Sequence, residues 1–600
     1  MSVHSRRLAW RKPAAVCLLI VAVPLLAQSQ QAPAVNRTGG SPSDPELPAR
    51  IVRLDAVVTD KLGRPIRDLK AADFQVVEAG VAQNVYAVEP ARAERVVALL
   101  LDDFHVAPGS DTESVRQAAL RFVDDQLRPS DLLAVHRPLD PISKIHFSRD
   151  RDVARQAIQA FNGRKGDFTA LTEFEQKYIG RSPEAVRAAR AQIVSAGLRG
   201  LVTSIGELGA GRSAIVLVTE GFARDAPSER SRRIPDLQGL ARAASRYNVA
   251  IYSLDPRTPQ GPGVMPDVAD GEWAGLETLA AETGGETAIG SSQLDLALQR
   301  VARDLDAYYL LTYTSSHEAD GRFYEVQVRT KVASAQVKAR TGYWAPLRAE
   351  LLGAADLRPS PPPRMLKRSI LIDIWIGLTI DPDGAQQVLF TWQPAAPRNR
   401  PRPGSAPSIV SLRVTTKEGA VLYEGEIRPP RAPLGPVRDE VARFAADPGR
   451  VQFDLEIIAA DGNVLDKAAH DIDVPDIGKA DPFILPPQVL RCSSAREFRE
   501  LSANPVAAPV PLREFRRTDR LLVRVPTHSP SGAPISLSAR VVNRLGQVLR
   551  EIPALQPSAG IATQFDLPLG WLAAGDYTLE LTASTSAGKA REVVRFRVTG

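Results

Sequence analysis

Cysteine is almost absent from this sequence, with two residues in a chain of 600. Cys17 lies in an apolar N-terminal stretch, so the rest of the chain holds one thiol, Cys492, and no internal disulfide is expected. The segment around Cys492, VLRCSSAREF, contains no histidine that could activate a nucleophilic thiol. We therefore expect Cys492 to be a structural residue.

The short motifs of common enzyme and nucleotide sites are also missing. No P-loop, H-E-x-x-H or G-x-S-x-G motif occurs, and the seven histidines are scattered along the chain. The net charge is +6, but acidic and basic residues are interleaved, and no basic stripe with interleaved aromatic residues stands out. These absences favour a protein that is not an enzyme and does not bind nucleic acid.

The N-terminus has the pattern of a targeting segment. HSRRLAWRK carries positive charge, residues 14–27 form an apolar run, and small residues near Ala27 are typical of a cleavage site. This predicts a signal peptide over residues 1–27 and a secreted, periplasmic or cell-envelope protein. The alternative is a retained membrane anchor, although the run is shorter than the roughly 20 residues that span a bilayer. No later segment is long and apolar enough to span one.

Composition and periodicity divide the remaining chain into several parts. Strand-like and helix-like runs alternate until the proline-rich PSPPP stretch, after which helical patterning nearly disappears and strand patterns continue. The predicted parts are a flexible spacer (28–50), a small β-rich unit (51–92), an α/β domain with a terminal β extension (93–346), a proline-rich linker (347–367) and two immunoglobulin-like β-sandwiches (368–480 and 481–600).

Three apolar runs of the α/β region each end in a carboxylate. They are residues 95–103, 213–222 and 248–257, and the carboxylates are Asp102, Glu220 and Asp255. Uninterrupted apolar runs are typical of parallel strands that are buried on both faces. Ligands of such sheets bind at the edge where the strands end. We therefore expect the functional site at these carboxylates.

Helical patterns lie between and after these runs. Residues 183–208 predict a long helix before the second run, 237–247 a helix before the third, and 294–305 a helix after it. Ser110 and Glu113 have the spacing of a capping box, which predicts that Ser110 caps a further helix.

Residues 51–346 resemble the von Willebrand factor type A (VWA) domain family, and more narrowly the exported bacterial VWFA-related proteins. The resemblance depends on an ordered set of motifs: ADFQVVEAG, LLLDD, VTEGF, YSLDPR, LAAETGG, DLDAYYLLTYT and KARTGYWAP. It implies a Rossmann-like domain whose carboxyl edge commonly carries a metal-ion-dependent adhesion site. That site uses a D-x-S-x-S loop, a threonine and a further aspartate, and such oxygen ligands suit Mg²⁺.

The family's ligand positions are only partly matched. Asp102 corresponds to the first aspartate, Thr169 in Thr-Ala-Leu corresponds to the threonine, and Glu220 takes the place of the later aspartate. Phe104 and Val106 stand where the two serines should be, and neither offers an oxygen to a metal. The resemblance therefore implies a degenerate site.

Three interpretations of this edge stay open. The first is a degenerate adhesion site that binds protein without an obligatory metal. The second is an altered site for Mg²⁺ or another divalent cation, in which Asp103 or His105 compensates; its ligands would be Asp102, Asp103, Thr169 and Glu220. In the third, these polar residues only cap strand ends and helix starts.

We expect an exported, non-enzymatic adhesion or scaffold protein whose carboxyl edge binds a protein partner. The candidate partner-binding residues are His105, Asp255, Arg230, Arg232 and Arg233. One alternative is a secreted enzyme that uses His105 with Asp102 or Asp103, and another is a purely structural envelope protein. The sequence names neither the partner nor the oligomeric state.

Overall fold

The computed structural model describes residues 51–600 except for several short segments. These are 91–94, 173–174, 177–178, 180, 209–210, 222–236, 258–273, 319, 347–363, 382–383, 396–405, 431–439, 480, 545 and 557–560. The predicted signal, the spacer, most of the proline-rich linker and the cluster of Arg230, Arg232 and Arg233 therefore lie outside the described residues. Among the residues described, no helix is both long and apolar enough to cross a membrane.

Five parallel strands form a sheet in the order β6–β5–β7–β8–β9. The strands are β5 (Val96–Leu101), β6 (Leu132–His136), β7 (Ser213–Val218), β8 (Val249–Asp255) and β9 (Thr287–Ile289). Every residue of β5, β7 and β8 is buried, so the uninterrupted apolar runs are explained by helices that cover both faces. The three strand predictions of the sequence are confirmed.

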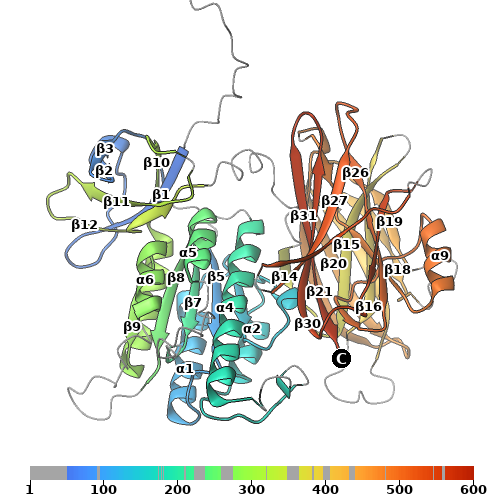
Figure 1. Cartoon of the computed structure of the whole chain (residues 1–600), viewed down its shortest axis with the longest axis horizontal. Coiled ribbons are helices and arrows are strands. Elements are labelled where there is room, and N and C mark those ends of the chain that lie inside the picture. The colour runs from blue at the N-terminus through green and yellow to red at the C-terminus, as the bar shows by residue number, and fades with distance from the viewer. Residues whose placement is uncertain are drawn as a thin grey trace, which may run out of the picture. The chain divides into compact units, whose positions relative to one another are not determined.

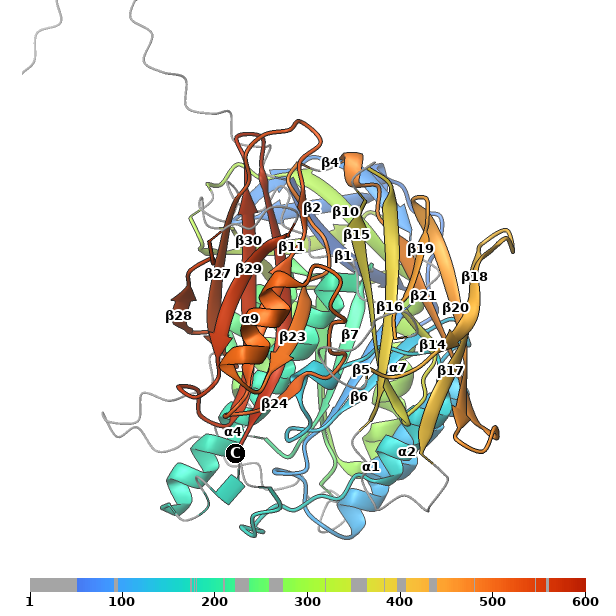
Figure 2. The ribbon, with the colours of Figure 1, turned by 90° about the vertical axis from the view of Figure 1, so that its right-hand side faces the viewer.

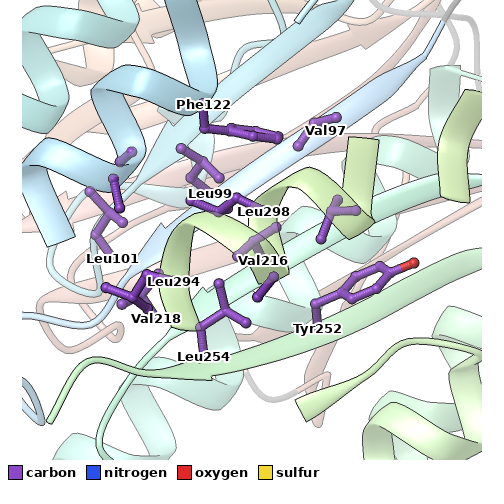
Figure 3. Close-up of a cluster of buried hydrophobic side chains, with 14 of the residues drawn as sticks. Val97, Leu99, Leu101, Phe122, Val216, Val218, Tyr252, Leu254, Leu294 and Leu298 are labelled. Atoms are coloured by element: carbon purple, nitrogen blue, oxygen red, sulfur yellow. The ribbon is translucent and has the colours of Figure 1, made fainter. Parts of the chain in front are cut away.

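Among the described residues, six helices cover the two faces of this sheet. One face packs against α4 (Pro183–Leu208), α5 (Leu237–Arg246) and α6 (Ala274–Thr283). The other packs against α1 (Ser110–Arg121), α2 (Arg151–Gln159) and α7 (Leu294–Asp306), and Figure 3 shows Leu294 and Leu298 of α7 in the same cluster as Val216 of β7. A π-helical turn (Phe122–Gln126) continues α1.

The start of α1 differs from the prediction. Ser110 is the first residue of the helix rather than its cap, and the cap position is Gly109. Gly109 has a φ of 86°, a conformation that glycine adopts without the steric cost that other residues meet. The capping-box prediction for Ser110 was therefore wrong.

Strands from both sides of the α/β region build a small β unit (Figure 1). One sheet has the order β12–β1–β10–β4, and the other has the order β13–β11–β2–β3. The strands are β1 (Ile51–Thr59), β2 (Phe74–Glu78), β3 (Val81–Gln83), β4 (Val85–Pro90), β10 (Tyr308–Thr314), β11 (Phe323–Thr330), β12 (Gln336–Ala339) and β13 (Gly342–Trp344). Thus the segment before the α/β sheet and the β extension after it share one core.

A buried polar network lies between β1 and the start of β7. Asp55 of β1 accepts a hydrogen bond from Arg340 (Nη2 to Oδ1, 2.8 Å) and forms an ion pair with Arg212. Arg340 also donates to Asn248 Oδ1 (2.6 Å). The two arginines flank a single carboxylate, and Asp55, Arg212 and Arg340 are each at most 3% exposed.

Two β-sandwiches make up the C-terminal part of the chain. The first pairs the sheet β14–β21–β20–β17–β18 with the sheet β15–β16–β19 around one core. Its strands are β14 (Arg364–Lys367), β15 (Ile372–Ile380), β16 (Gln386–Pro394), β17 (Pro407–Thr416), β18 (Val421–Ile427), β19 (Ala442–Ala445), β20 (Gly449–Ala459) and β21 (Val464–Val474).

The second sandwich pairs β23–β25–β29 with β24–β31–β30–β27–β28, and β22 pairs with β26. The strands are β22 (Phe483–Ile484), β23 (Gln488–Cys492), β24 (Glu514–Arg516), β25 (Arg520–Val525), β26 (Thr527–His528), β27 (Ser536–Asn543), β28 (Val548–Ile552), β29 (Thr563–Pro568), β30 (Gly575–Ser584) and β31 (Lys589–Thr599). The helix α9 (Ala495–Ala503) lies beside β23 (Figure 2). The predicted β-sandwich architecture is confirmed for both segments.

Candidate functional site

The carboxyl edge of the parallel sheet, where β5, β7 and β8 end, carries the three carboxylates that the sequence singles out. Asp102 follows β5, Glu220 lies two residues beyond β7, and Asp255 is the last residue of β8. All three are buried, with exposed fractions of 0 to 2%. Backbone hydrogen bonds from Asp102 to Val218 and from Thr219 to Leu254 keep the three strand ends side by side.

Both carboxylate oxygens of Asp102 accept hydrogen bonds within the chain. Oδ1 accepts from the backbone N–H of Phe104 at 3.1 Å. Oδ2 accepts from the Thr219 hydroxyl at 2.8 Å and lies 2.7 Å from Nδ1 of His105. The His105 side chain is only 12% exposed. Asp102 therefore holds the loop after β5 against the end of β7.

Asp103 differs from its neighbour. It is 8% exposed, and its Oδ1 has no hydrogen-bond partner among the described residues. Burial, together with the negative charge of Asp102, raises the pKa of Asp103 to about 7, while the charges of Arg137 and Arg164 act in the opposite direction. Near neutral pH this carboxyl group is therefore partly protonated.

Glu220 is bound on both sides. Its Oε1 accepts from the backbone N–H of Ala107 at 2.5 Å, and its Oε2 accepts from Lys165 Nζ at 2.7 Å. The side chain of Glu220 is 3% exposed, whereas that of Lys165 is 44% exposed. The ammonium group of Lys165 thus neutralises a carboxylate that is nearly excluded from water.

A loop over residues 164–171 contains Lys165 and Thr169. Thr169 is exposed; its N–H donates to Asp167 Oδ1 at 2.8 Å, and its carbonyl accepts from Arg164 Nη2 at 2.6 Å. At the end of the loop, the N–H of Leu171 donates to Oε2 of the buried Glu175 at 2.8 Å. Thr169 is thus part of the loop's own hydrogen-bond network.

The two positions that the family fills with serine belong to the apolar core here. Phe104 is 1% exposed and Val106 is 0% exposed, and they pack on opposite faces of the sheet. The guanidinium carbons of Arg190 and Arg164 lie 4.7 Å and 5.7 Å from the centroid of the Phe104 ring. These positions therefore contribute packing rather than metal ligands.

Sequence reasoning missed the basic side chains and the glutamate that organise this edge. Arg164 forms an ion pair with Glu175 at 2.9 Å, and Arg190 donates to the carbonyl of Asp167 at 2.6 Å. The burial of Arg190 could have been predicted from the sequence, because Arg190 lies four residues after Val186 and therefore on the same buried face of α4. Arg164, Lys165 and Glu175 lie in a segment without periodicity, which gave no such signal.

The arrangement does not fit a bound divalent ion. Mg²⁺ needs near-octahedral oxygen ligands, but two expected ligand positions are apolar and the oxygens of Asp102 and Glu220 already accept hydrogen bonds. Within the described part of the chain, no group of three or more His, Cys, Asp or Glu side chains is placed to hold a metal. The edge is built as a network of hydrogen bonds and ion pairs.

Both carboxylate oxygens of Asp255 accept hydrogen bonds, as those of Glu220 do. Arg257, two residues later, donates from its backbone N–H to Asp255 Oδ1 at 2.9 Å and from Nε to Oδ2 at 2.8 Å. Asp255 itself is 0% exposed. Of this pair, only the partly buried guanidinium group of Arg257 reaches toward solvent, with a side-chain exposure of 15%.

Comparisons with known proteins add no functional assignment. No protein-family model matches the chain, and no curated protein matches it. Solved structures that match include fibronectin(III)-like modules of Clostridium thermocellum CbhA, with 10% identity over 38% of this chain and 94% of that one, and a TM-score of 0.13. The titin I-band fragment I67–I69 matches with 12% identity over 49% and 80%, and a TM-score of 0.11. With TM-scores this low, we draw no conclusion from either.

Proposed function

We propose that this chain is an exported, non-enzymatic protein-binding module whose VWA-like domain presents its carboxyl edge to a partner without a divalent ion. The VWA assignment is supported by the ordered motifs of residues 51–346 and is consistent with the five-stranded parallel sheet. Export is supported by the N-terminal charge and apolar run. The C-terminal sandwiches, immunoglobulin-like by their strand spacing, would act as spacers or additional contact surfaces.

The observation that carries this proposal is the exposure of apolar side chains on a loop that is itself fixed. Phe168 is 41% exposed and Leu171 is 66% exposed. In the described residues between 95 and 306, only one other large apolar side chain, Leu296, is exposed. The ion pair of Arg164 with Glu175 and the hydrogen bonds of residues 164–171 hold the loop in place. Large apolar groups on a preorganised loop are typical of contact residues in protein interfaces.

Capture followed by titration with a purified partner tests this function. Wild-type protein and the double variant Phe168→Ser/Leu171→Ser would each be used to capture proteins from an envelope extract of the source cells. A captured protein would then be purified and titrated with both forms in the presence of EDTA. We expect saturable binding that survives EDTA and is lost in the double variant. Binding that persists in the double variant, or that EDTA abolishes, would contradict the proposal.

One observation favours a second candidate function. The 2.7 Å contact between Asp102 Oδ2 and His105 Nδ1 orients the imidazole as a carboxylate orients the general base in many hydrolases. A secreted hydrolase would lose turnover of a suitable substrate on His105→Ala while partner capture stayed unchanged. The adhesion proposal predicts the reverse dependence, on Phe168 and Leu171 rather than on His105.

A further inference from the structure

Lys165 connects its own loop to two other segments of the carboxyl edge. Its backbone N–H donates to the carbonyl of Val106 at 3.0 Å, in the loop that follows β5. Its ammonium group donates to Glu220 Oε2 at 2.7 Å, just beyond the end of β7. Lys165 itself belongs to the loop 164–171, whose remaining contacts hold Phe168 and Leu171 in place. One residue therefore links the loop after β5, the end of β7 and the exposed apolar side chains.

We propose that the ammonium group of Lys165 is a built-in cation that holds the loops of this edge together by binding Glu220, one of the residues that the resemblance makes a metal ligand. A metal would draw the loops together by binding their oxygens, and here a covalently attached cation binds Glu220 instead. This inference deepens the proposed function, on which its biological meaning rests, because it explains why partner binding would need no metal. It also makes Lys165 a positioning residue for the loop 164–171.

Burial distinguishes this ion pair from an ordinary surface pair. Glu220 is 3% exposed, and its other oxygen is already bound to Ala107 N–H, so without Lys165 a charged carboxylate would stay buried and unneutralised. Such an uncompensated charge is costly, whereas exposed pairs contribute little. The pair of Arg155 and Asp124 in the same domain, with side chains 39% and 43% exposed, provides a matched control.

Thermal unfolding of four variants of the full chain tests the assignment. Lys165→Met should lower the melting temperature by several degrees, and Lys165→Arg should restore most of this loss because it keeps the charge. The double variant Lys165→Met/Glu220→Gln should lose less than Lys165→Met alone, since no buried charge is left without a partner. Arg155→Met should change little. Equal effects of Lys165→Met and Arg155→Met would overturn the proposal.

Hydrogen exchange distinguishes a local effect on the loop 164–171 from a general loss of stability. Below the melting range, Lys165→Met should speed exchange in the peptide that contains residues 164–171, and Arg155→Met should not. Exchange that is unchanged in this peptide would show that Lys165 does not position the loop.

The last test of the Lys165 proposal is the addition of metal ions. Millimolar Mg²⁺, Mn²⁺, Ca²⁺ or EDTA should leave the melting temperature of the wild type unchanged, and calorimetric titration with each cation should show no saturable binding. Saturable binding that disappears in Asp102→Ala and Glu220→Ala would overturn the inference in favour of an altered metal site. Because these measurements use no partner, their failure would leave partner capture through Phe168 and Leu171 as a separate question.

Discussion

The guanidinium group of Arg190 contacts two phenylalanine rings, with its central carbon 4.7 Å from the centroid of Phe104 and 5.1 Å from that of Phe168. Phe104 is part of the buried core of the sheet, whereas Phe168 is 41% exposed. The buried helix residue Arg190 thus connects the core to the proposed contact loop. The same guanidinium group donates a hydrogen bond to the backbone carbonyl of Asp167, which holds the loop beside α4.

The two rings should respond very differently to truncation. Phe104→Ala removes a fully buried aromatic side chain and should lower the free energy of unfolding by about 3 to 5 kcal/mol. Phe168→Ala removes a largely exposed ring and should cost less than about 1 kcal/mol. Urea unfolding followed by tryptophan fluorescence would measure both. Similar losses for the two variants would mean that Phe168 is a core residue rather than a contact residue.

Stability should fall with rising pH because of Asp103. The pKa of this carboxyl group is about 7 in the folded chain against an ordinary value of 3.8, so the folded state keeps a proton that the unfolded state releases between these values. The contribution of protonated Asp103 to the free energy of unfolding is complete below pH 3.8. It declines by about 1.4 kcal/mol per pH unit as the pH rises from there to about 7. Asp103→Asn removes this slope.

Unfolding free energies measured at pH 5 and pH 8 would test the role of Asp103. The unfolding free energy of the wild type, compared with that of Asp103→Asn, should be higher at pH 5 than at pH 8. A difference that does not change between the two pH values would show that Asp103 titrates normally.

His136 should make the stability of the protein rise with pH, which is the opposite of the effect of Asp103. Burial lowers the pKa of this imidazole from 6.5 to about 4, and the residue is 2% exposed at the end of β6. The folded state holds it neutral, so its contribution is complete above pH 6.5 and is lost as pH falls toward 4. His136→Gln cannot titrate, and its stability should depend less steeply on pH in this window than that of the wild type. Parallel curves for the two proteins between pH 4 and 6.5 would refute this.

The network around Asp55 should be essential to the small β unit. Arg340→Met leaves Asp55 paired with Arg212 but removes the buried hydrogen bonds that Arg340 donates to Asp55 and Asn248, and losing a buried hydrogen bond to a charged group costs about 1.5 to 3 kcal/mol. Arg322→Met, in a pair with Asp320 whose arginine is 81% exposed, should cost less than about 0.5 kcal/mol. Chemical unfolding of both variants gives the comparison. Equal losses would mean that the buried network contributes no more than a surface ion pair.

Local patterns predicted the α/β sheet because its strands are buried on both faces and therefore carry uninterrupted apolar runs. The helix over residues 183–208 was predicted with the bounds that α4 has, since these 26 residues contain no proline after the first one and can form a single long helix. The pairing of β1 with β10 was not predicted, because Val57 and its partner Tyr308 are far apart in sequence and neither strand encodes the other's register. The short helix α2 and the three-residue strand β9 were also missed.

The site was predicted less completely than the fold. Asp102 and Glu220 were found because each follows an apolar strand, a signal that periodicity provides. The side chains that decide their chemistry, Lys165 and Arg164, come from an irregular loop whose path depends on tertiary contacts such as the hydrogen bond from Arg164 N to the Asp103 carbonyl at 2.7 Å. No spacing rule places an irregular loop against a strand end.

Cys492 should be inert in the folded protein. The thiol lies at the end of β23 with an exposed fraction of 0%, and burial raises its pKa to about 12, so almost no reactive thiolate exists near neutral pH. Iodoacetamide should therefore leave the peptide that contains Cys492 unlabelled in the native protein and label it fully in urea, as judged by mass spectrometry of that peptide alone. The labelling rate at intermediate urea should then follow the opening of the last sandwich, because the thiol packs with Leu490 and Leu522 in one buried cluster. Rapid labelling without denaturant would contradict both the burial and the structural role of this residue.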